Sequence, residues 1–353
     1  MIENIHIKNF RGIKDCFISG IKQINLFFGR NNCGKSSVLD ALFLFSAANN
    51  PRYPLTINWS RNYLNRGPES LKMNFYRLNT DSNIVFNGKY GTNIRNVEIE
   101  YEETLSPVLT IPTNPGTSNV NDKIYSLNLN TEISSTEDNS SQKKEYHTSI
   151  RFEGKTKATV TDIDSSYKEE LECVYITANE PFHNNVELFA TLLENKQENF
   201  VFDMLRKVEP NLKDIVSANG ELLADIGMEK RIPIQLLGDG IRKLLSVILH
   251  IYGSKKKVLL IDEVDNGLHY SAMPTLWTAI LEVAKITDTQ IFVTTHNLDS
   301  IKGLANVLEE KGNEYQEMIS AFKLIKRNTD ELIALNYDYE KFDYSIKQEM
   351  EMR

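Results

Sequence analysis

The sequence predicts an α/β fold in which short buried strands alternate with helices around a phosphate-binding loop. Residues 29–36, Gly-Arg-Asn-Asn-Cys-Gly-Lys-Ser, have the G-x-x-x-x-G-K-[ST] spacing of such a loop. Two later apolar strands end in polar groups, one in Asp262 and Glu263 and the other in His296. The loop and these two strand ends are the observations on which the fold class depends.

The context of the loop also fits. Apolar residues 24–28 read as a strand, and residues 37–43 read as a helix whose positive N-terminus faces the phosphates. Two glycines let the backbone N–H groups point at a triphosphate, the lysine reaches the β and γ phosphates, and the serine hydroxyl can hold Mg²⁺. The expected nucleotide contacts are Gly29, Asn31, Asn32, Cys33, Gly34, Lys35, Ser36 and Ser37. A glycine turn before a helix is the alternative interpretation.

The strand at residues 257–261 is followed by two acids, and the phosphate loop suggests what these acids do. Beside such a loop, Asp262 can hold Mg²⁺ through water and Glu263 can polarise the attacking water. Alone, the pattern is more typical of a strand that ends in solvent. The third strand, residues 290–295, delivers His296 at its exit, where it could donate a hydrogen bond to the γ-phosphate. A lone histidine would otherwise be incidental.

Composition sets limits on the class of protein. The chain has 353 residues and 41% hydrophobic content, so we expect one large domain plus an insertion. The cysteines Cys16, Cys33 and Cys173 lack metal-ligand spacing, which favours a reducing, cytoplasmic location. The sequence has no apolar run of transmembrane length and no signal-peptide pattern. A net charge of −8 argues against a globally basic nucleic-acid binder, although a local patch stays open.

The middle of the chain has a different character. Asn, Ser, Thr and Gly dominate residues 104–142, and alternating strands are predicted at 97–101 and 124–129. This pattern indicates an inserted β-rich lobe with a polar loop and without long coiled-coil arms. Residues 255–257, three lysines, read as a solvated turn rather than a DNA contact.

The second half returns to an αβ rhythm. Helical patterns cover residues 186–208 and 239–252, and Gly253 ends the second. The 57 residues after His296 predict a helix to Gly312, a hairpin over 318–336 and a polar end. We expect no room there for a nuclease domain of the TOPRIM type.

The order of the phosphate loop, residues 237–243, the acidic strand and the histidine resembles the heads of ABC-type ATPases. The runs 7–12, 261–270 and 294–297 resemble specifically the overcoming-lysogenisation-defect, or AAA15, group. Heads of that group often serve bacterial defence against phage beside a nuclease. The resemblance implies an ATPase with ATP and Mg²⁺ as cofactors.

The resemblance also assigns residue roles. Arg11 would approach the phosphates, and His296 would be the switch histidine. The signature loop would be Gly238, Asp239 and Gly240. Many ABC heads have Leu-Ser-Gly-Gly where this chain has Leu-Gly-Asp-Gly, so the contact of the signature serine is missing. Backbone N–H groups, Arg242 or Lys243 are candidates to replace it.

In this family architecture the signature loop of one chain closes over nucleotide bound by another. The expected partner is therefore a second copy, in an ATP-dependent head-to-tail homodimer, with a higher oligomer left open. The expected domains are residues 1–50 as the first part of the head, 51–171 as the inserted lobe, 172–327 as the second part, and 328–353 as a C-terminal strand and polar tail.

Three functions follow, and the first is favoured. It is a sensor or regulator of a separate effector, a nuclease, in anti-phage defence. The second is a DNA recombination or repair ATPase, and the third is the nucleotide-binding subunit of a transporter, which would need a membrane-coupling partner.

Cys33 leads to a separate hypothesis. It lies beside Lys35 and at a helix N-terminus, and both favour the thiolate form and therefore a reactive side chain. The alternative is that Cys33 is only a small tolerated residue.

Overall fold

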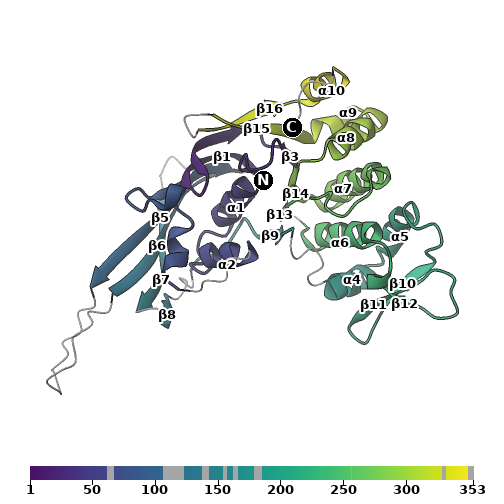
Figure 1. Cartoon of the computed structure of the whole chain (residues 1–353), viewed down its shortest axis with the longest axis horizontal. Coiled ribbons are helices and arrows are strands. Elements are labelled where there is room, and N and C mark those ends of the chain that lie inside the picture. Colours follow the sequence, from purple (N-terminus) through teal and green to yellow (C-terminus); the bar gives the residue numbers. More distant parts are fainter. Residues whose placement is uncertain are drawn as a thin grey trace.

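The structure is a computed structural model that describes residues 1–61, 67–105, 123–136, 143–153, 157–161, 166–178, 185–255, 257–327 and 331–348. Among these residues it contains a six-stranded, a seven-stranded and a three-stranded sheet. Helices lie on both sides of the six-stranded sheet, as Figure 1 shows. The predicted α/β fold is confirmed.

The six-stranded sheet is the centre of the molecule and has the order β16-β15-β3-β14-β13-β9. Its strands are β3 (Ile24–Phe28), β9 (Cys173–Ile176), β13 (Val258–Ile261), β14 (Gln290–Thr295), β15 (Ile319–Lys326) and β16 (Leu332–Tyr337). All neighbouring pairs are parallel except β15 with β16. Because helices cover both faces, the inner strands are buried along their whole length and are mostly apolar instead of alternating.

The two faces of this sheet belong to two hydrophobic cores. Leu26 and Val293 face a core shared with α6 (Asp239–Gly253), α7 (Met273–Thr287) and α8 (Leu298–Lys311). The neighbouring residues Phe27 and Phe292 face the other core, shared with α1 (Lys35–Ser46). Their rings stack with centroids 6.3 Å apart. This alternation fixes the strand register and therefore the side chains at each strand end.

The seven-stranded sheet is antiparallel and has the order β2-β1-β4-β5-β6-β7-β8. Its strands are β1 (Ile2–Phe10), β2 (Ile13–Ser19), β4 (Ile84–Tyr90), β5 (Asn93–Leu105), β6 (Lys123–Ser135), β7 (Lys143–Glu153) and β8 (Lys157–Val160). The predicted β-rich character of this segment is confirmed, and its sheet continues into the N-terminal hairpin. The division of the chain at residues 50 and 171 stays a prediction. Most of the predicted polar loop, residues 106–122 and 137–142, lies outside the described residues.

Short elements connect these layers. They are α2 (Tyr53–Ser60), α3 (Glu69–Lys72), η1 (Tyr76–Leu78), α4 (Asn185–Glu194), α5 (Glu198–Arg206), β10 (Asp214–Ala218), β11 (Glu221–Asp225), β12 (Ile232–Pro233), η2 (Ile234–Leu236), η3 (Tyr270–Ala272), α9 (Asn313–Glu317) and α10 (Tyr339–Lys347). The predicted helix over 239–252 is confirmed as α6. The pattern over 186–208 forms two helices, because Lys196 between them has a φ of 56°.

The C-terminal segment corrects one expectation. The predicted hairpin is confirmed, but the polar end after it forms helix α10, which begins at the capping residue Asp338. Phe342 of this helix is buried and packs against Phe28, with ring centroids 6.2 Å apart. One apolar face is therefore enough to dock a segment that is polar on average.

Arg95 on β5 ties the seven-stranded sheet to the end of α1. Its buried guanidinium donates to the carbonyl oxygens of Phe45 and Ser46 at 2.9 and 3.0 Å, and it pairs with Glu169 at 2.7 Å. We expect Arg95→Met to lower the free energy of unfolding by about 3–5 kcal/mol, since it leaves these groups without their partner. Denaturant unfolding measures this change.

Lys143 provides the control for this prediction. It pairs with Glu132 at 2.6 Å and with Glu145 at 3.3 Å, and these side chains are exposed to solvent. Lys143→Met should cost less than about 1 kcal/mol. Equal losses of unfolding free energy for the two variants would contradict the prediction that the buried ion pair contributes more than the exposed one.

Candidate nucleotide-binding site

The phosphate loop connects β3 to α1 and has the backbone that its glycines predict. Gly29 and Gly34 have φ angles of 143° and 103°, in the region that favours glycine. A Cβ atom on Gly29 would lie only 2.7 Å from the carbonyl oxygen of Leu324 on β15. The loop therefore approaches its neighbour so closely that a larger residue at this position would displace it.

Lys35 is folded into this loop. It is 8% exposed, and its Nζ donates to the carbonyl oxygens of Gly29 and Arg30, both at 2.9 Å. The ammonium group is thus held where the backbone curls. These bonds go to neutral oxygens, which bind a cation less strongly than phosphate oxygens do.

The carboxyl end of β13 lies beside the start of α1. The Ser36 hydroxyl donates to Asp262 Oδ1 at 3.1 Å, and the Thr294 hydroxyl from the end of β14 donates to the same oxygen at 2.6 Å. Asp262 is 1% exposed. A carboxylate and a hydroxyl that converge in this way are the oxygen ligands that suit Mg²⁺. The two residues predicted for the metal are therefore adjacent.

Glu263 and His296 stand at the ends of the neighbouring strands β13 and β14. Glu263 Oε1 lies 3.9 Å from His296 Nδ1, and the side chains are 38% and 46% exposed. The Glu263 backbone has a φ of 49°, and its N–H donates to the Thr294 hydroxyl at 2.8 Å. This left-handed conformation is uncommon for a residue other than glycine, and the side chain at this bend reaches solvent. The predicted base and switch histidine are thus brought together.

Arg11 is adjacent to α1 in the turn between β1 and β2. Its Nη1 pairs with Asp40 and its Nη2 donates to Asn58 Oδ1 at 2.8 Å. In this conformation its guanidinium is engaged by α1 and α2. Its expected approach to phosphate stays a prediction.

Sequence reasoning missed the group that surrounds Asp40. Arg61, at the end of α2, pairs with Asp262 and Asp40 at 2.7 and 3.0 Å, and Tyr175 of β9 donates to Asp40 at 2.9 Å. Asp40 lies four residues after Ser36, so it shares a helix face with it, and this spacing was a usable signal. The nearness of Arg61 had no local signal.

The signature residues lie at the start of α6. Gly238 caps this helix, and Asp239 in its first turn pairs with Arg242 at 2.9 Å. A Cβ atom on Gly267 would lie 3.7 Å from Asp239 Cβ, so the turn after β13 packs against this loop. Arg242, a candidate to replace the missing serine, is thus engaged with Asp239 within the loop.

Cys33 corrects another expectation. Burial raises the pKa of its thiol, and this effect exceeds the lowering by Lys35 and the backbone N–H groups. The sequence therefore predicted the direction of this pKa shift wrongly, because burial outweighs the local charges. Burial also raises the pKa of Cys16, to about 12, and that of Cys173.

We expect Cys33 to react with iodoacetamide more slowly than glutathione at pH 7.5. Because its pKa is raised, less of the thiol is ionised at neutral pH, and the rate should continue to rise at pH values where glutathione has reached its plateau. Mass spectrometry of labelled peptides over a pH series measures both rates. A Cys33 rate above that of glutathione at pH 7.5 would contradict this prediction.

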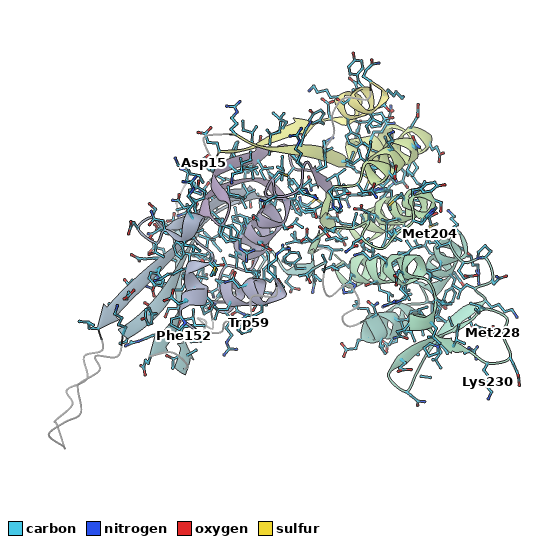
Figure 2. All side chains as sticks on the ribbon, in the orientation of Figure 1. Asp15, Trp59, Phe152, Met204, Met228 and Lys230 are labelled. Carbon is cyan, nitrogen blue, oxygen red and sulfur yellow. The ribbon has the colours of Figure 1, made fainter. Side chains whose placement is uncertain are left out.

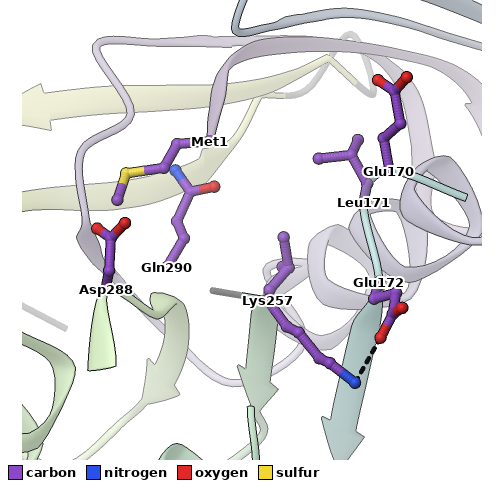
Figure 3. Close-up of a pocket in the computed structure, with 8 residues that line it drawn as sticks. Met1, Glu170, Leu171, Glu172, Lys257, Asp288 and Gln290 are labelled. Carbon is purple, nitrogen blue, oxygen red and sulfur yellow. Dashed lines mark ion pairs between the residues drawn. The ribbon is translucent and has the colours of Figure 1, made fainter. Parts of the chain in front are cut away.

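Two cavities lie near the central sheet. One of ≈ 330 Å³ is lined by Arg30, Asn31, Asn32, Cys33 and residues 323–326, so there is room beside the phosphate loop. The other, of ≈ 110 Å³, lies at the opposite edge of the sheet, where β13 and β14 begin. Figure 3 shows the ion pair between Lys257 and Glu172 at this second cavity.

The lysine run 255–257 is described only in part, because Lys256 lies outside the described residues.

Comparisons with known proteins identify the family of the chain. Residues 24–301 match the family described as "AAA domain, putative AbiEii toxin, Type IV TA system", and the chain belongs to this family. An ATP/GTP phosphatase of Helicobacter pylori is 25% identical over an alignment of 372 positions that covers 99% of both chains. A 75-residue stretch is 35% identical to ATP-binding cassette sub-family A member 6 of Homo sapiens and covers 21% of this chain and 5% of that protein.

Among solved structures, an SMC head crystallised with the C-terminal winged-helix domain of ScpA is similar in fold. Its TM-score is 0.50 at 11% identity, with 96% of this chain and 98% of that chain covered. The family and the fold together define the chain as an ATP-binding P-loop ATPase of the AAA/ABC-like class. In the part of the chain that the structure describes, no helix is long and apolar enough to cross a membrane.

Proposed function

We propose that the chain is a nucleotide-operated switch in which two copies close head to tail over two ATP molecules and separate after hydrolysis. The observation that carries this proposal is the distance of 3.9 Å between the exposed carboxylate of Glu263 and the imidazole of His296. When the base and the group that binds the γ-phosphate are adjacent, hydrolysis depends on whether the bound nucleotide carries a γ-phosphate.

Each residue has a role in this proposal. Lys35 binds the β and γ phosphates, with contacts from Gly29, Asn31, Asn32, Gly34 and Ser37, and Ser36 and Asp262 hold Mg²⁺. The metal supplies charge neutralisation of the phosphates. Glu263 accepts a proton from the attacking water, and His296 donates a hydrogen bond to the γ-phosphate.

The signature loop supports assembly with a second copy. Gly238 and the Asp239 side chain are exposed at the N-terminus of a helix of 15 residues. Such a helix end presents backbone N–H groups that suit an anionic ligand, even without a serine. The loop of one chain would then complete the nucleotide site of its partner, related by a two-fold axis.

For the biological role we propose a cytoplasmic sensor or regulator of a separate effector, a nuclease, in anti-phage defence. The resemblance to the overcoming-lysogenisation-defect group supports this role, and so does the family description, which names a putative toxin of a toxin–antitoxin system. A recombination or repair ATPase is the second candidate, and DNA-stimulated ATP hydrolysis would distinguish it from the first.

We expect the purified chain to hydrolyse ATP without cutting DNA. The assay combines the chain with plasmid, ATP and Mg²⁺ or Mn²⁺, and it includes GTP because the H. pylori relative is named for both nucleotides. Cleavage that persists after rigorous purification and depends on residues of this chain would overturn the two-component proposal. DNA-stimulated hydrolysis would favour the repair function, and a nuclease that co-purifies with the native protein would favour the defence function.

A further inference from the structure

Arg61 bridges two buried carboxylates beside the proposed metal position. Its Nη1 lies 2.7 Å from Asp262 Oδ2, and its Nη2 lies 3.0 Å from Asp40 Oδ1. The two carboxylates are almost fully buried, whereas the Arg61 side chain is 28% exposed. The guanidinium therefore balances the charge of Asp262 and shares that of Asp40 with Arg11.

The two terminal nitrogens of this guanidinium, Nη1 and Nη2, have different hydrogen-bond partners. Nη2 donates to Tyr175 OH at 2.8 Å as well as to Asp40, and Tyr175 itself donates to Asp40 at 2.9 Å. Nη1, by contrast, donates to Asp262 Oδ2. The Asp40 and Tyr175 contacts can therefore hold the side chain if the contact with Asp262 is broken.

Both carboxylate oxygens of Asp262 are engaged in this arrangement. Oδ1 accepts from Ser36 and Thr294, and Oδ2 accepts from Arg61. A divalent cation at Ser36 and Asp262 would need this carboxylate, and it would repel a guanidinium a few ångströms away. The arginine and the metal compete for the same charge.

We propose that Arg61 is an internal counter-ion that must release Asp262 before Mg²⁺ binds with the nucleotide, while it stays anchored to Asp40 and Tyr175. The inference rests on the proposed metal site at Ser36 and Asp262. It makes Arg61 a positioning residue that holds Asp262 in place and opposes metal entry.

Release of Asp262 by Arg61 would also affect helix α2. Arg61 directly follows α2, whose residue Asn58 binds Arg11 at 2.8 Å and the carbonyl of Ser70 at 2.8 Å. Trp59, labelled in Figure 2, marks this end of the helix. Breaking the contact with Asp262 would therefore remove one tether of the end of α2, while its contacts with Asp40, Tyr175 and the N-terminal hairpin stay.

The test is the Mg²⁺ dependence of ADP binding. The affinity for a fluorescent ADP analogue is measured with excess Mg²⁺ and with EDTA, and the ratio reports how much the metal strengthens binding. Arg61→Gln should increase this ratio about tenfold or more, because Mg²⁺ no longer displaces a charged hydrogen-bond partner. Arg52→Gln removes an exposed charge from the start of the same helix and should keep the ratio of the unaltered chain.

Asp262→Asn separates the inference from the proposal beneath it. If Asp262→Asn loses the Mg²⁺ dependence but Arg61→Gln leaves the ratio unchanged or smaller, the counter-ion role is wrong and the metal site stands. If Asp262→Asn keeps the full ratio, the metal site itself is wrong.

A second measurement uses the unaltered chain and does not depend on the folding of a variant. In a crystal structure with ADP and Mg²⁺, we expect Arg61 Nη1 to be more than about 4 Å from Asp262, beyond hydrogen-bond distance, with the Asp40 contact kept. A retained contact of Arg61 with Asp262 beside bound Mg²⁺ would overturn the inference.

Discussion

Glu263→Gln should lower the rate of ATP hydrolysis by about 10²–10⁴-fold, the range for loss of a positioned general base. Glutamine has almost the same shape, but its amide cannot accept the proton of the attacking water. The backbone bond from Glu263 to Thr294, 2.8 Å long, does not involve the side chain and should persist. Binding of Mg–ATP should therefore be retained.

Phosphate release measures hydrolysis, and a fluorescent ATP analogue measures binding. Glu221→Gln, an exposed position on β11, makes the same chemical change away from the site and should leave the rate unaltered. Hydrolysis by Glu263→Gln at the rate of the unaltered chain would mean that another group is the base.

Lys35→Ala should weaken nucleotide binding itself by about 10- to 100-fold, since hydrogen bonds to charged groups are among the strongest in proteins. The ammonium is already held at the loop by the carbonyls of Gly29 and Arg30, so little rearrangement opposes its contact with phosphate. Equilibrium titration with a fluorescent ATP analogue measures the loss.

Lys302→Ala serves as the matched control, because this lysine is exposed on α8. The two site variants should differ in kind: Lys35→Ala loses affinity, whereas Glu263→Gln keeps affinity and loses turnover. If Lys35→Ala bound ATP as tightly as the control, the loop would not be the phosphate site.

The features that were predicted correctly have local signals. The phosphate loop combines glycine conformations with a strand and a helix at fixed spacing, and α6 shows a helical period that ends at Gly253. The strand ends at Asp262 and His296 follow from apolar runs that stop at polar residues. Parallel pairing of β13 with β14 then brings Glu263 and His296 to one edge.

The features that were missed depend on long-range contacts. Arg61 and Asp262 are separated by 201 residues, and no local pattern marks either as the partner of the other. Cys33 shows a different limit: its neighbours in sequence predict a lowered pKa, but burial by distant parts of the fold outweighs them. The packing of Phe342 against Phe28 is also a long-range contact, and it holds helix α10 in place although the composition of this segment is polar.

The molecular mass of Glu263→Gln in solution tests the central claim most directly, because this variant should trap ATP between two chains. We expect light scattering coupled to size exclusion to show a dimer, or an assembly built from it, with Mg–ATP and a shift toward the monomer with Mg–ADP. The same experiment with Lys35→Ala should show no difference between the nucleotides. If Glu263→Gln has the same mass with Mg–ATP as with Mg–ADP while ATP binding is intact, the nucleotide does not join the chains and the proposed switch is wrong.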